Sequence, residues 1–284
     1  MPNTLETGVV VRDIEEISEM RDVERLQKEV WRCADRDVVP ALALIPSVEV
    51  GGILVGAFDR GELVGFAYGF VGLEAGRPII HSDMLAVRPA YRGRGLGYRL
   101  KLAQRERALA RGVSTMTWTF DPLQARNAHL NFAKLGVVAG RYCVNFYGEE
   151  TSSFLHQHTG TDRLWVRWDL TSERVRRRLE RAPGSGPSDV PARVKRLVSA
   201  VASGAPRVSD LRGGEAPGQL LIEIPGDIAA LQQRSPAMAV AWRDATRRAF
   251  AEALAAGFVV EEFYRLAAGG RGGGAYLLRR RDND

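Results

Sequence analysis

Hydrophobic and polar residues follow the two-residue period of β-strands along much of the first 170 residues. Two β-rich runs within residues 51–72 flank Asp59, Arg60 and Gly61, whose turn chemistry predicts a β-hairpin. Other apolar runs predict further strands at residues 9–17, 77–87, 113–120, 141–148 and 163–170. These strands indicate one domain that covers residues 1–170.

Helical periodicity separates these strands. Met20, Val23 and Leu26 recur at helical spacing after Ser18, a residue suited to an N-cap. Two further helices are predicted, from the glycine-rich turn to residue 112 and from about residue 125 to residue 136. Residues 36–50 contain two prolines and are predicted to form a loop.

The composition changes after residue 170. A short arginine-rich helix is followed by "APGSGPSDVP" (182–191), which is typical of a linker. The remaining residues predict a helix at 192–202, a strand at 219–225, a long helix at 235–257 and a hairpin formed by 258–266 and 275–280. We therefore expect a helix and linker at residues 171–191 and a small C-terminal α+β extension at residues 192–284.

Composition bounds the class of protein. The 284 residues are 45% hydrophobic and 26% charged, and no run of about 18 apolar residues predicts a membrane span. The N-terminus shows no basic region followed by an apolar run, so a secretory signal is not expected. Cys33 and Cys143 lie too far apart for a metal motif or a disulfide framework. These features predict a cytoplasmic protein with two buried, reduced thiols.

The net charge of +6 and the pI of about 9.6 permit an anionic partner, which could be nucleic acid, a membrane surface or a phosphorylated cofactor. The arginine clusters at 172–181 and 278–281 indicate a solvated helix and tail. Because the interleaved aromatic and basic residues of nucleic-acid modules are missing, we expect no nucleic-acid partner. We expect no membrane partner either.

The stretch "AVRPAYRGRGLGYRL" (86–100) places three glycines directly before a predicted helix. Glycine lets backbone N–H groups approach a ligand, and the first N–H groups of a helix lack internal partners at its positive end. Arg92 and Arg94 add positive charge. The stretch therefore predicts a phosphate-binding turn.

The spacing of this turn separates the possible phosphate sites. Gly93, Gly95 and Gly97 are spaced G-x-G-x-G, so the Rossmann pattern G-x-G-x-x-G would need glycine at Leu100. The G-K-[ST] of a Walker loop is absent. The pattern [RQ]-x-x-G-x-[GA] does fit, directly after a strand that ends in "LAV".

This pattern resembles the pyrophosphate-binding motif of the GCN5-related N-acetyltransferase (GNAT) superfamily. The later run "RNAHLNFAKLG" is similar to the second signature of that superfamily, and the resemblance covers roughly residues 8–170. It implies the GNAT fold, an α+β (α/β) architecture with a mixed, mostly antiparallel central sheet flanked by helices. The runs "NFYG" and "TDRLWVRW" also resemble a family of larger acyltransferases with a C-terminal extension, some of which are associated with N-succinylation of amino acids.

The resemblance implies an acyl-CoA co-substrate, either acetyl-CoA or succinyl-CoA. The extended pantetheine arm of CoA would pair with the backbone of the strand that ends at residue 87, as an added strand would. The pyrophosphate of CoA would lie in the glycine turn. The residues implied to bind it are Leu85, Ala86, Val87, Arg92, Gly93, Arg94, Gly95, Leu96, Gly97, Asn127 and Phe132. An ordinary tight turn is the alternative interpretation of the glycines, and a helix cap is the alternative for Asn127.

Acyl transfer to an amine requires a group that removes a proton from the amine. Strict alternation along residues 79–87 would place His81 and Asp83 on one face and Ser82 and Met84 on the other. His81 is suited to act as the base, and Asp83 could orient it or bind the substrate ammonium. A structural His–Asp hydrogen bond is the alternative, and a bulge would break the alternation.

The superfamily commonly places a tyrosine as the acid at the position that Phe132 occupies here. Tyr147 is the candidate substitute, unless the thiolate leaves unassisted. Arg163 and Arg141 are candidates for binding a carboxylate on the donor or acceptor. The remaining histidines lack metal-ligand spacing, so no metal is expected; they are His129, His156 and His158.

The leading hypothesis is an acyl-CoA-dependent N-acyltransferase that acts on the amine of a small molecule, for which an amino acid is one candidate. A catalytically weak acyl-CoA-binding sensor or interaction module is the alternative. The apolar face of "PAMAVAW" must be buried, so the C-terminal extension could cover the acceptor cleft or form a homodimer.

Overall fold

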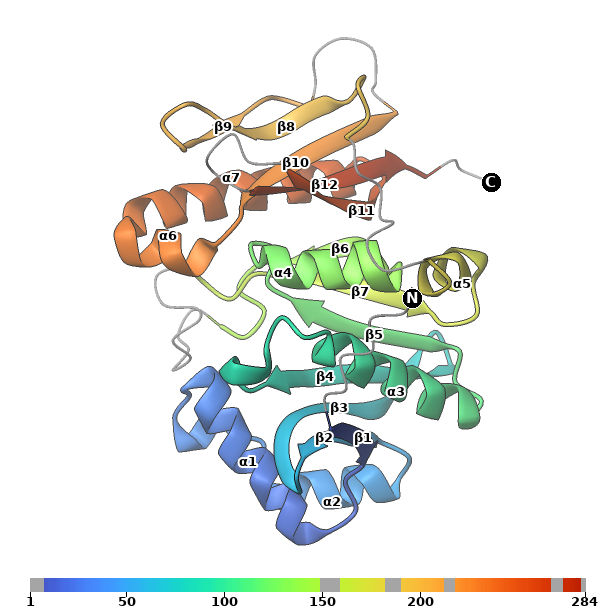
Figure 1. The fold of residues 1–284 in the computed structure, drawn as a ribbon. Coiled ribbons are helices and arrows are strands. Elements are labelled where there is room, and N and C mark those ends of the chain that lie inside the picture. Colours follow the sequence, from blue (N-terminus) through green and yellow to red (C-terminus); the bar gives the residue numbers. More distant parts are fainter. Residues whose placement is uncertain (1–7, 149–158, 182–189, 212–217, 267–272, 282–284) are drawn as a thin grey trace. The chain divides into compact units, whose positions relative to one another are not determined.

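The computed structural model describes residues 8–148, 159–181, 190–211, 218–266 and 273–281 (Figure 1). Two compact units make up the chain: unit 1 ends at Trp118, and unit 2 begins at Thr119. A division into compact units does not show which segments fold independently. The expected division of the chain into residues 1–170, 171–191 and 192–284 therefore stays a prediction. Most of the expected linker, residues 182–189, lies outside the described residues.

Unit 1 is built on a mixed sheet with the strand order β1-β2-β3-β4-β5 (Figure 1). The strands are β1 (Val9–Asp13), β2 (Ile53–Asp59), β3 (Glu62–Glu74), β4 (Arg77–Val87) and β5 (Thr115–Phe120), whose last two residues belong to unit 2. The first four strands pair antiparallel, and β5 joins β4 in parallel. The predicted mixed, mostly antiparallel sheet is thus confirmed.

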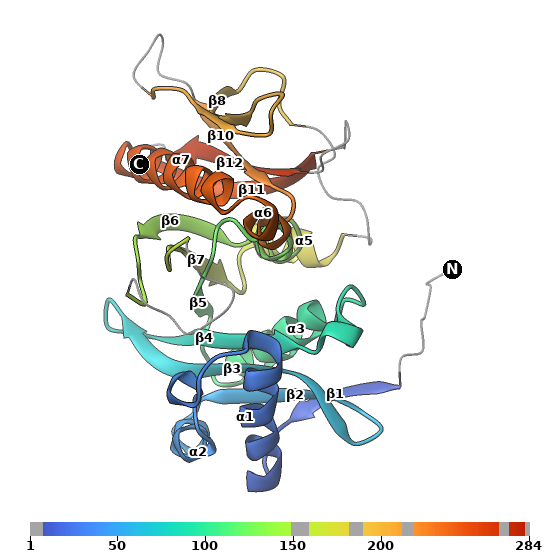
Figure 2. The same cartoon turned by 90° about the vertical axis from the view of Figure 1, so that its left-hand side faces the viewer.

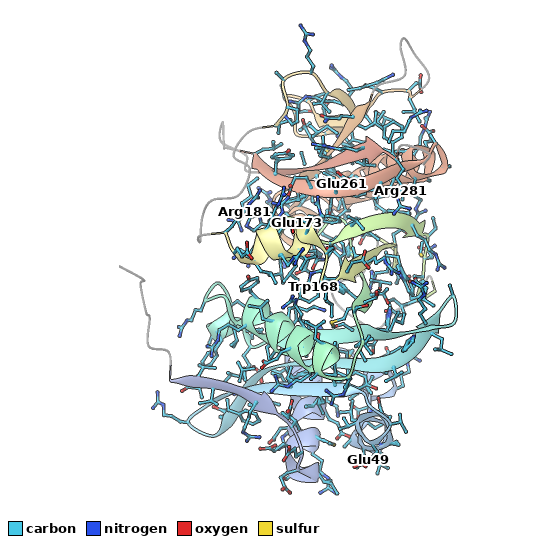
Figure 3. All side chains as sticks on the ribbon, turned by 90° about the vertical axis from the view of Figure 1, so that its right-hand side faces the viewer. Glu49, Trp168, Glu173, Arg181, Glu261 and Arg281 are labelled. Atoms are coloured by element: carbon cyan, nitrogen blue, oxygen red, sulfur yellow. The ribbon has the colours of Figure 1, made fainter. Side chains whose placement is uncertain are left out.

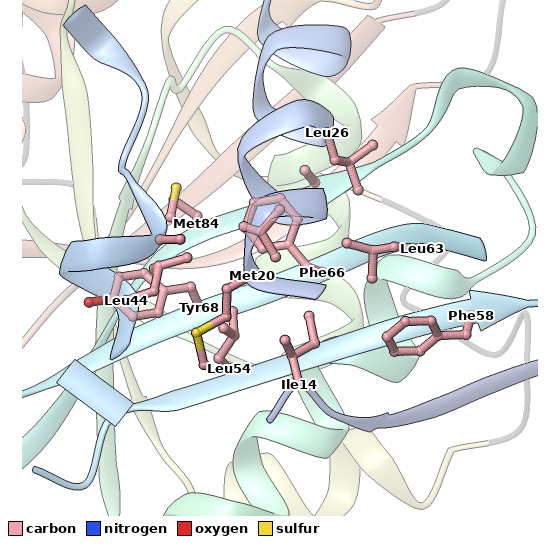
Figure 4. Close-up of a cluster of buried hydrophobic side chains, with 13 residues drawn as sticks. Ile14, Met20, Leu26, Leu44, Leu54, Phe58, Leu63, Phe66, Tyr68 and Met84 are labelled. Carbon is pink, nitrogen blue, oxygen red and sulfur yellow. The ribbon is translucent and has the colours of Figure 1, made fainter. Parts of the chain in front are cut away.

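Helices cover both faces of this sheet, with α1 and α2 on one side and α3 on the other (Figure 2). Their bounds are α1 (Ile17–Trp31), α2 (Ala41–Glu49) and α3 (Leu96–Ala110). The short helix η1 (Asp35–Asp37) lies between α1 and α2, and η2 (Pro89–Tyr91) lies between β4 and α3. As the spacing predicted, α1 buries Met20, Val23 and Leu26. They pack on Phe66 and Tyr68 of β3 in a core that also includes Leu44 of α2 (Figure 4).

The prediction of a loop over residues 36–50 is wrong for its second half, which forms α2. Pro40 stands at the N-cap, outside the helix, and Pro46 lies inside it. An internal proline removes one hydrogen bond. Burial of Ala41 and Leu44 in the unit 1 core offsets this loss.

Unit 2 contains a second run of paired strands in the order β7-β6-β11-β12-β10-β8-β9. Their bounds are β6 (Val138–Cys143), β7 (Arg163–Asp169), β8 (Lys195–Ala200), β9 (Pro206–Val208), β10 (Gln219–Pro225), β11 (Phe258–Leu266) and β12 (Gly273–Arg280). The helices are α4 (Ala125–Ala128), η3 (His129–Leu135), α5 (Glu173–Leu179), α6 (Ile228–Arg234) and α7 (Pro236–Ala255). The predicted C-terminal α+β elements are therefore present.

An aromatic cluster joins the C-terminal elements of unit 2 to its earlier ones. The ring of Tyr276 on β12 contacts Phe132 of η3, Phe250 of α7 and Phe263 of β11, with centroids 4.9–5.7 Å apart. Its hydroxyl donates to Pro122 O at 2.6 Å. The C-terminal extension thus shares one core with residues that precede position 170.

Two more buried contacts hold unit 2 together. The indole of Trp168 on β7 donates to Leu135 O at 2.8 Å (Figure 3). Arg178 of α5 forms a buried ion pair with Glu262 of β11. These contacts tie α5 and β7 to the helical segment and to the C-terminal strands.

Two strand assignments and the state of the cysteines differ from the predictions. Residues 192–202 were predicted to be a helix but contain β8, which pairs with β10 and β9. β-Branched Val198 suits that sheet position. The strand predicted at 141–148 is β6, which begins earlier, at Val138. Cys33 and Cys143 are half-buried rather than buried.

Among the described helices, none is long and apolar enough to cross a membrane.

We expect Gly274→Ala to destabilise unit 2. A Cβ at this position of β12 would overlap the ring of Phe263, which has no room to move within the aromatic cluster. Overpacking of this kind costs about 1–3 kcal/mol. Gly140→Ala is the matched control, because a Cβ there meets open space. Equal free energies of unfolding for the two variants in a denaturant titration would contradict this packing.

Candidate functional site

Strand β4 carries a bulge between His81 and Met84. On β3, Tyr68 pairs with Met84 and Phe70 pairs with His81, so β4 has one extra residue here. Gly69 lies opposite the bulge, where a Cβ would come within 2.9 Å of His81 O. The missing side chain therefore lets the bulged backbone approach β3 closely.

The bulge corrects the predicted alternation of side chains along β4. Ser82 faces α3, where its hydroxyl accepts a hydrogen bond from Lys101 Nζ (2.6 Å) and donates to Gln104 Oε1 (2.8 Å). Met84 instead packs into the core beneath α1 and α2. Ser82 and Met84, which were predicted to share a face, thus lie on opposite faces.

His81 lies on β4 at the start of the bulge. Its Nδ1 is 2.9 Å from Thr117 Oγ1 of β5, and its ring centroid is 5.3 Å from that of Phe70. Burial, with a smaller contribution from the positive charge of Lys101, lowers the pKa of His81 to about 4. The imidazole is therefore neutral near pH 7 and can accept a proton.

Asp83 is solvent-exposed at the bulge, and partial desolvation raises its pKa. Its negative charge contributes to the raised pKa of Tyr68, after the larger effect of burial. The Tyr68 hydroxyl donates to Ser47 Oγ of α2 at 2.7 Å. His81 thus lies beside the Phe70 ring of β3, and the roles of His81 and Asp83 stay predictions.

Beyond His81, no strand of the described part of the chain pairs with the β4 edge that faces β5. The parallel pairing with β5 is limited to Ile80–Met116 and His81–Thr117. Over residues 82–87, β3 is the strand that pairs with β4 in the described part of the chain. An extended ligand can add to such an edge as a strand would.

The glycine turn joins this open strand to α3. Gly93 and Gly95 have φ angles of +79° and +76°, and no heavy atom lies within 4 Å of a Cβ built on either. Gly95 is the N-cap of α3, and Arg92 and Arg94 are exposed beside it. Positively charged side chains and free helix N–H groups therefore border a space without side chains, which fits a phosphate group.

Two residues implied to bind CoA lie in unit 2. Asn127 is exposed on α4, and because Gln124 is the N-cap of that helix, the cap interpretation of Asn127 is wrong. Phe132 is fully buried against Phe120 and Tyr276. It is a core residue of unit 2 in this structure, and a contact of either residue with CoA stays a prediction.

Tyr147 lies in unit 2 and is half-exposed. Its hydroxyl is 3.4 Å from Thr119 Oγ1, and its backbone N–H donates to Thr161 Oγ1. The buried guanidinium of Arg163 lies 4.9 Å from the centre of its ring. Arg141 is exposed and lies over another ring, that of Trp165. Arg163, of the two candidate arginines, thus lies beside the candidate acid.

A buried ionic network around Tyr147 was missed by the sequence analysis. Arg247 of α7 contacts both carboxylate oxygens of Asp162, at 2.8 and 2.9 Å, and Tyr142 donates to the same carboxylate. Arg243, one turn earlier on α7, pairs with Asp121 at 2.7 Å. The i,i+4 spacing of the two arginines was the available signal. The extension thus anchors the segment that carries Tyr147.

The remaining histidines form no visible cluster. His129 is half-buried on η3, whereas His156 and His158 lie outside the described residues. No group of three or more possible metal ligands occurs in the part of the chain that the structure describes. The expected absence of a metal stays a prediction.

The low pKa of His81 predicts a loss of stability on acidification. The unfolded chain binds a proton near pH 6.5, whereas the folded chain binds it near pH 4, so the free energy of unfolding decreases as pH falls through this window. We expect His81→Phe to remove this dependence. Relative to the native chain it should gain up to about 3 kcal/mol between pH 6.5 and 4. A difference that stays constant with pH in denaturant titrations would contradict the buried, neutral imidazole.

Comparison with known proteins identifies the fold. Residues 17–137 match the family described as "Acetyltransferase (GNAT) family". No curated protein matches the chain significantly. Solved structures that match part of the chain include the ribosomal-protein-S18-alanine N-acetyltransferase of Escherichia coli, with 15% identity, a TM-score of 0.45, and coverage of 58% of this chain and 95% of that one.

Two further structures are similar to the same extent. The NatC complex bound to Gag peptide and CoA shares 12% identity, with a TM-score of 0.46, and the match covers 57% of this chain and 99% of that one. An aminoglycoside 6'-N-acetyltransferase in complex with coenzyme A shares 14% identity, with a TM-score of 0.42 and coverage of 57% and 98%. The family match and the sheet described above establish the GNAT fold.

Proposed function

We propose that this chain, whose residues 17–137 carry an acetyltransferase domain of the GNAT family, is an acyl-CoA-dependent N-acyltransferase that acts on the amine of a small molecule. One observation carries the proposal: a strand with an open edge leads directly into a glycine turn at the N-terminus of α3. A thioester of CoA has the matching shape, an extended amide-containing arm followed by a pyrophosphate.

The side chains of His81 and Tyr147 suit the transfer step. Neutral His81 removes a proton from the acceptor amine, directly or through one water, and the amine nitrogen then attacks the thioester carbonyl carbon. The C–N bond forms, the C–S bond breaks, and the electron pair leaves with the CoA thiolate. Because a thiol has a pKa near 8.5, the thiolate can leave unassisted or take a proton from Tyr147.

The donor is proposed to be acetyl-CoA or succinyl-CoA. A succinyl group, or an amino acid as acceptor, brings a carboxylate that a fixed arginine can bind. Arg163 is the candidate, because its guanidinium is held beside Tyr147 by a hydrogen bond from Nη1 to Asp162 O.

A catalytically weak acyl-CoA sensor is the second candidate function. The observation that favours it is the complete burial of Phe132, where relatives in the superfamily carry the tyrosine that serves as acid. Binding of CoA thioesters without acyl transfer to any amine would support this function.

We expect Gly95→Ala to weaken CoA binding about tenfold or more, because an alanine at this φ angle distorts the first N–H groups of α3. Gly112→Ala is the matched control. Gly112 has a similar φ of +73° and equally open space, but it follows the other end of α3. Both variants should lose about 1–2 kcal/mol of stability. Equal CoA affinities by calorimetry would contradict a phosphate site at this turn.

Thermal unfolding with CoA, acetyl-CoA, succinyl-CoA and NADH, each in excess, tests the proposed function. A ligand at about 100 times its Kd stabilises the chain by about 2.7 kcal/mol, which raises Tm by a few degrees. We expect a shift with the thioesters and none with NADH, and thiol release when an amine is added. No shift with any thioester would overturn the proposal.

A further inference from the structure

Lys101 is a buried lysine on the face of the unit 1 sheet opposite His81. Its side chain leaves α3 and is only 2% exposed. The ammonium donates to Ser82 Oγ at 2.6 Å and lies 3.7 Å from the ring centre of Trp118. Ser82 in turn donates to Gln104. Lys101 of α3 therefore binds the bulge of β4 through Ser82, on the face of the sheet that α3 covers.

Burying the Lys101 side chain in these surroundings lowers the stability of the folded chain. Its contacts include the hydroxyl of Ser82 and the indole of Trp118, and no ion pair of Lys101 with a carboxylate is found among the described residues. Burial alone lowers the pKa of Lys101 to about 7. Gln104 Nε2 is also buried and finds no partner in the described structure. Because an apolar side chain would fill this space at less cost, packing does not explain the lysine.

The geometry connects Lys101 to His81 across the sheet. Thr117 and Trp118 are consecutive on β5, so their side chains point to opposite faces. His81 contacts Thr117 on one face, and Lys101 contacts Trp118 on the other. Ser82, the residue that Lys101 binds, directly follows His81 in the bulge. The positive charge of Lys101 also contributes to the low pKa of His81, after the larger effect of burial.

We propose that Lys101 is a positioning residue for acyl transfer: through its hydrogen bond to Ser82 it fixes the β4 bulge beside His81, and its ammonium acts on His81 across the sheet. This role rests on the proposed function only where it concerns acyl transfer. The effects of Lys101 on the bulge and on His81 involve residues of unit 1 alone and do not depend on the reaction. Its hold on the bulge explains why a lysine that lowers stability occupies this position, because it keeps the imidazole at a defined place on the strand.

The test compares Lys101→Met and Ser82→Ala with Lys28→Met, an exposed lysine of α1 that serves as control. Methionine keeps the packing over Trp118 but removes the charge and the donor. Three quantities are measured for each protein: the pKa of His81 by NMR titration, kcat and KM for acyl transfer, and Tm. The NMR titration needs no substrate, so it is independent of the proposed function.

In Lys101→Met we expect the pKa of His81 to rise by at least half a unit, kcat to fall about tenfold with KM for the thioester unchanged, and Tm to stay equal or rise. The acidic limb of the pH–kcat profile should move to higher pH by the same shift. Ser82→Ala should lower kcat while the pKa of His81 stays low, because the lysine charge remains. Lys28→Met should match the native chain.

An unchanged His81 pKa in Lys101→Met would overturn the proposal, as would a fall in Tm that accounts for the whole loss of activity. If Lys101→Met does not fold, Ser82→Ala decides: native kcat in that variant overturns the proposal. If the native chain shows no acyl transfer with any amine, the proposed function fails. A shifted His81 pKa in Lys101→Met would then still support the hold of Lys101 on the bulge.

Discussion

The end of parallel pairing between β4 and β5 after His81 is the constraint on which the proposed site depends. Beyond that point β4 is held by β3, and its other edge is open in the described part of the chain. The bulge opposite Gly69 lies at the same place and puts Ser82 and Met84 on opposite faces. One strand thus offers a backbone edge to an extended ligand and a proton acceptor beside it.

Unit 2 shows that the C-terminal extension is more than an addition to a finished domain. Tyr276 packs on Phe132, and the arginines of α7 pair with Asp121 and Asp162. Removing one partner of a buried ion pair leaves an uncompensated charge, so these contacts depend on each other. The segment around Tyr147 therefore owes its conformation to residues about a hundred positions later in the chain.

The sequence was sufficient where structure depends on neighbouring residues. The bounds of β4 at residues 77–87, the helix that starts after the glycine turn, and the β11–β12 hairpin follow from periodicity and turn chemistry. It was insufficient where distant residues decide. α2 forms despite Pro46 because the unit 1 core buries one of its faces, and β8 is a strand because β10 lies beside it.

The same distinction applies to the candidate site. The glycine turn and His81 could be found from the sequence, because a motif and a strand pattern mark them. Lys101 could not, since a lysine among leucines on a helix is ordinary until the strand beneath it is known. The pairing of Arg247 with Asp162 joins residues 85 positions apart and leaves only a helical spacing as a trace.

The most direct measurement is an NMR titration of the backbone amides with CoA. We expect the largest chemical-shift changes at the amides of the glycine turn, residues 93–98, and of the end of β4, residues 85–87. The amides of the β-hairpin turn at residues 59–62 should keep their chemical shifts. Changes confined to other parts of the chain, or none at saturating CoA, would contradict the assignment of this strand and turn as the CoA site.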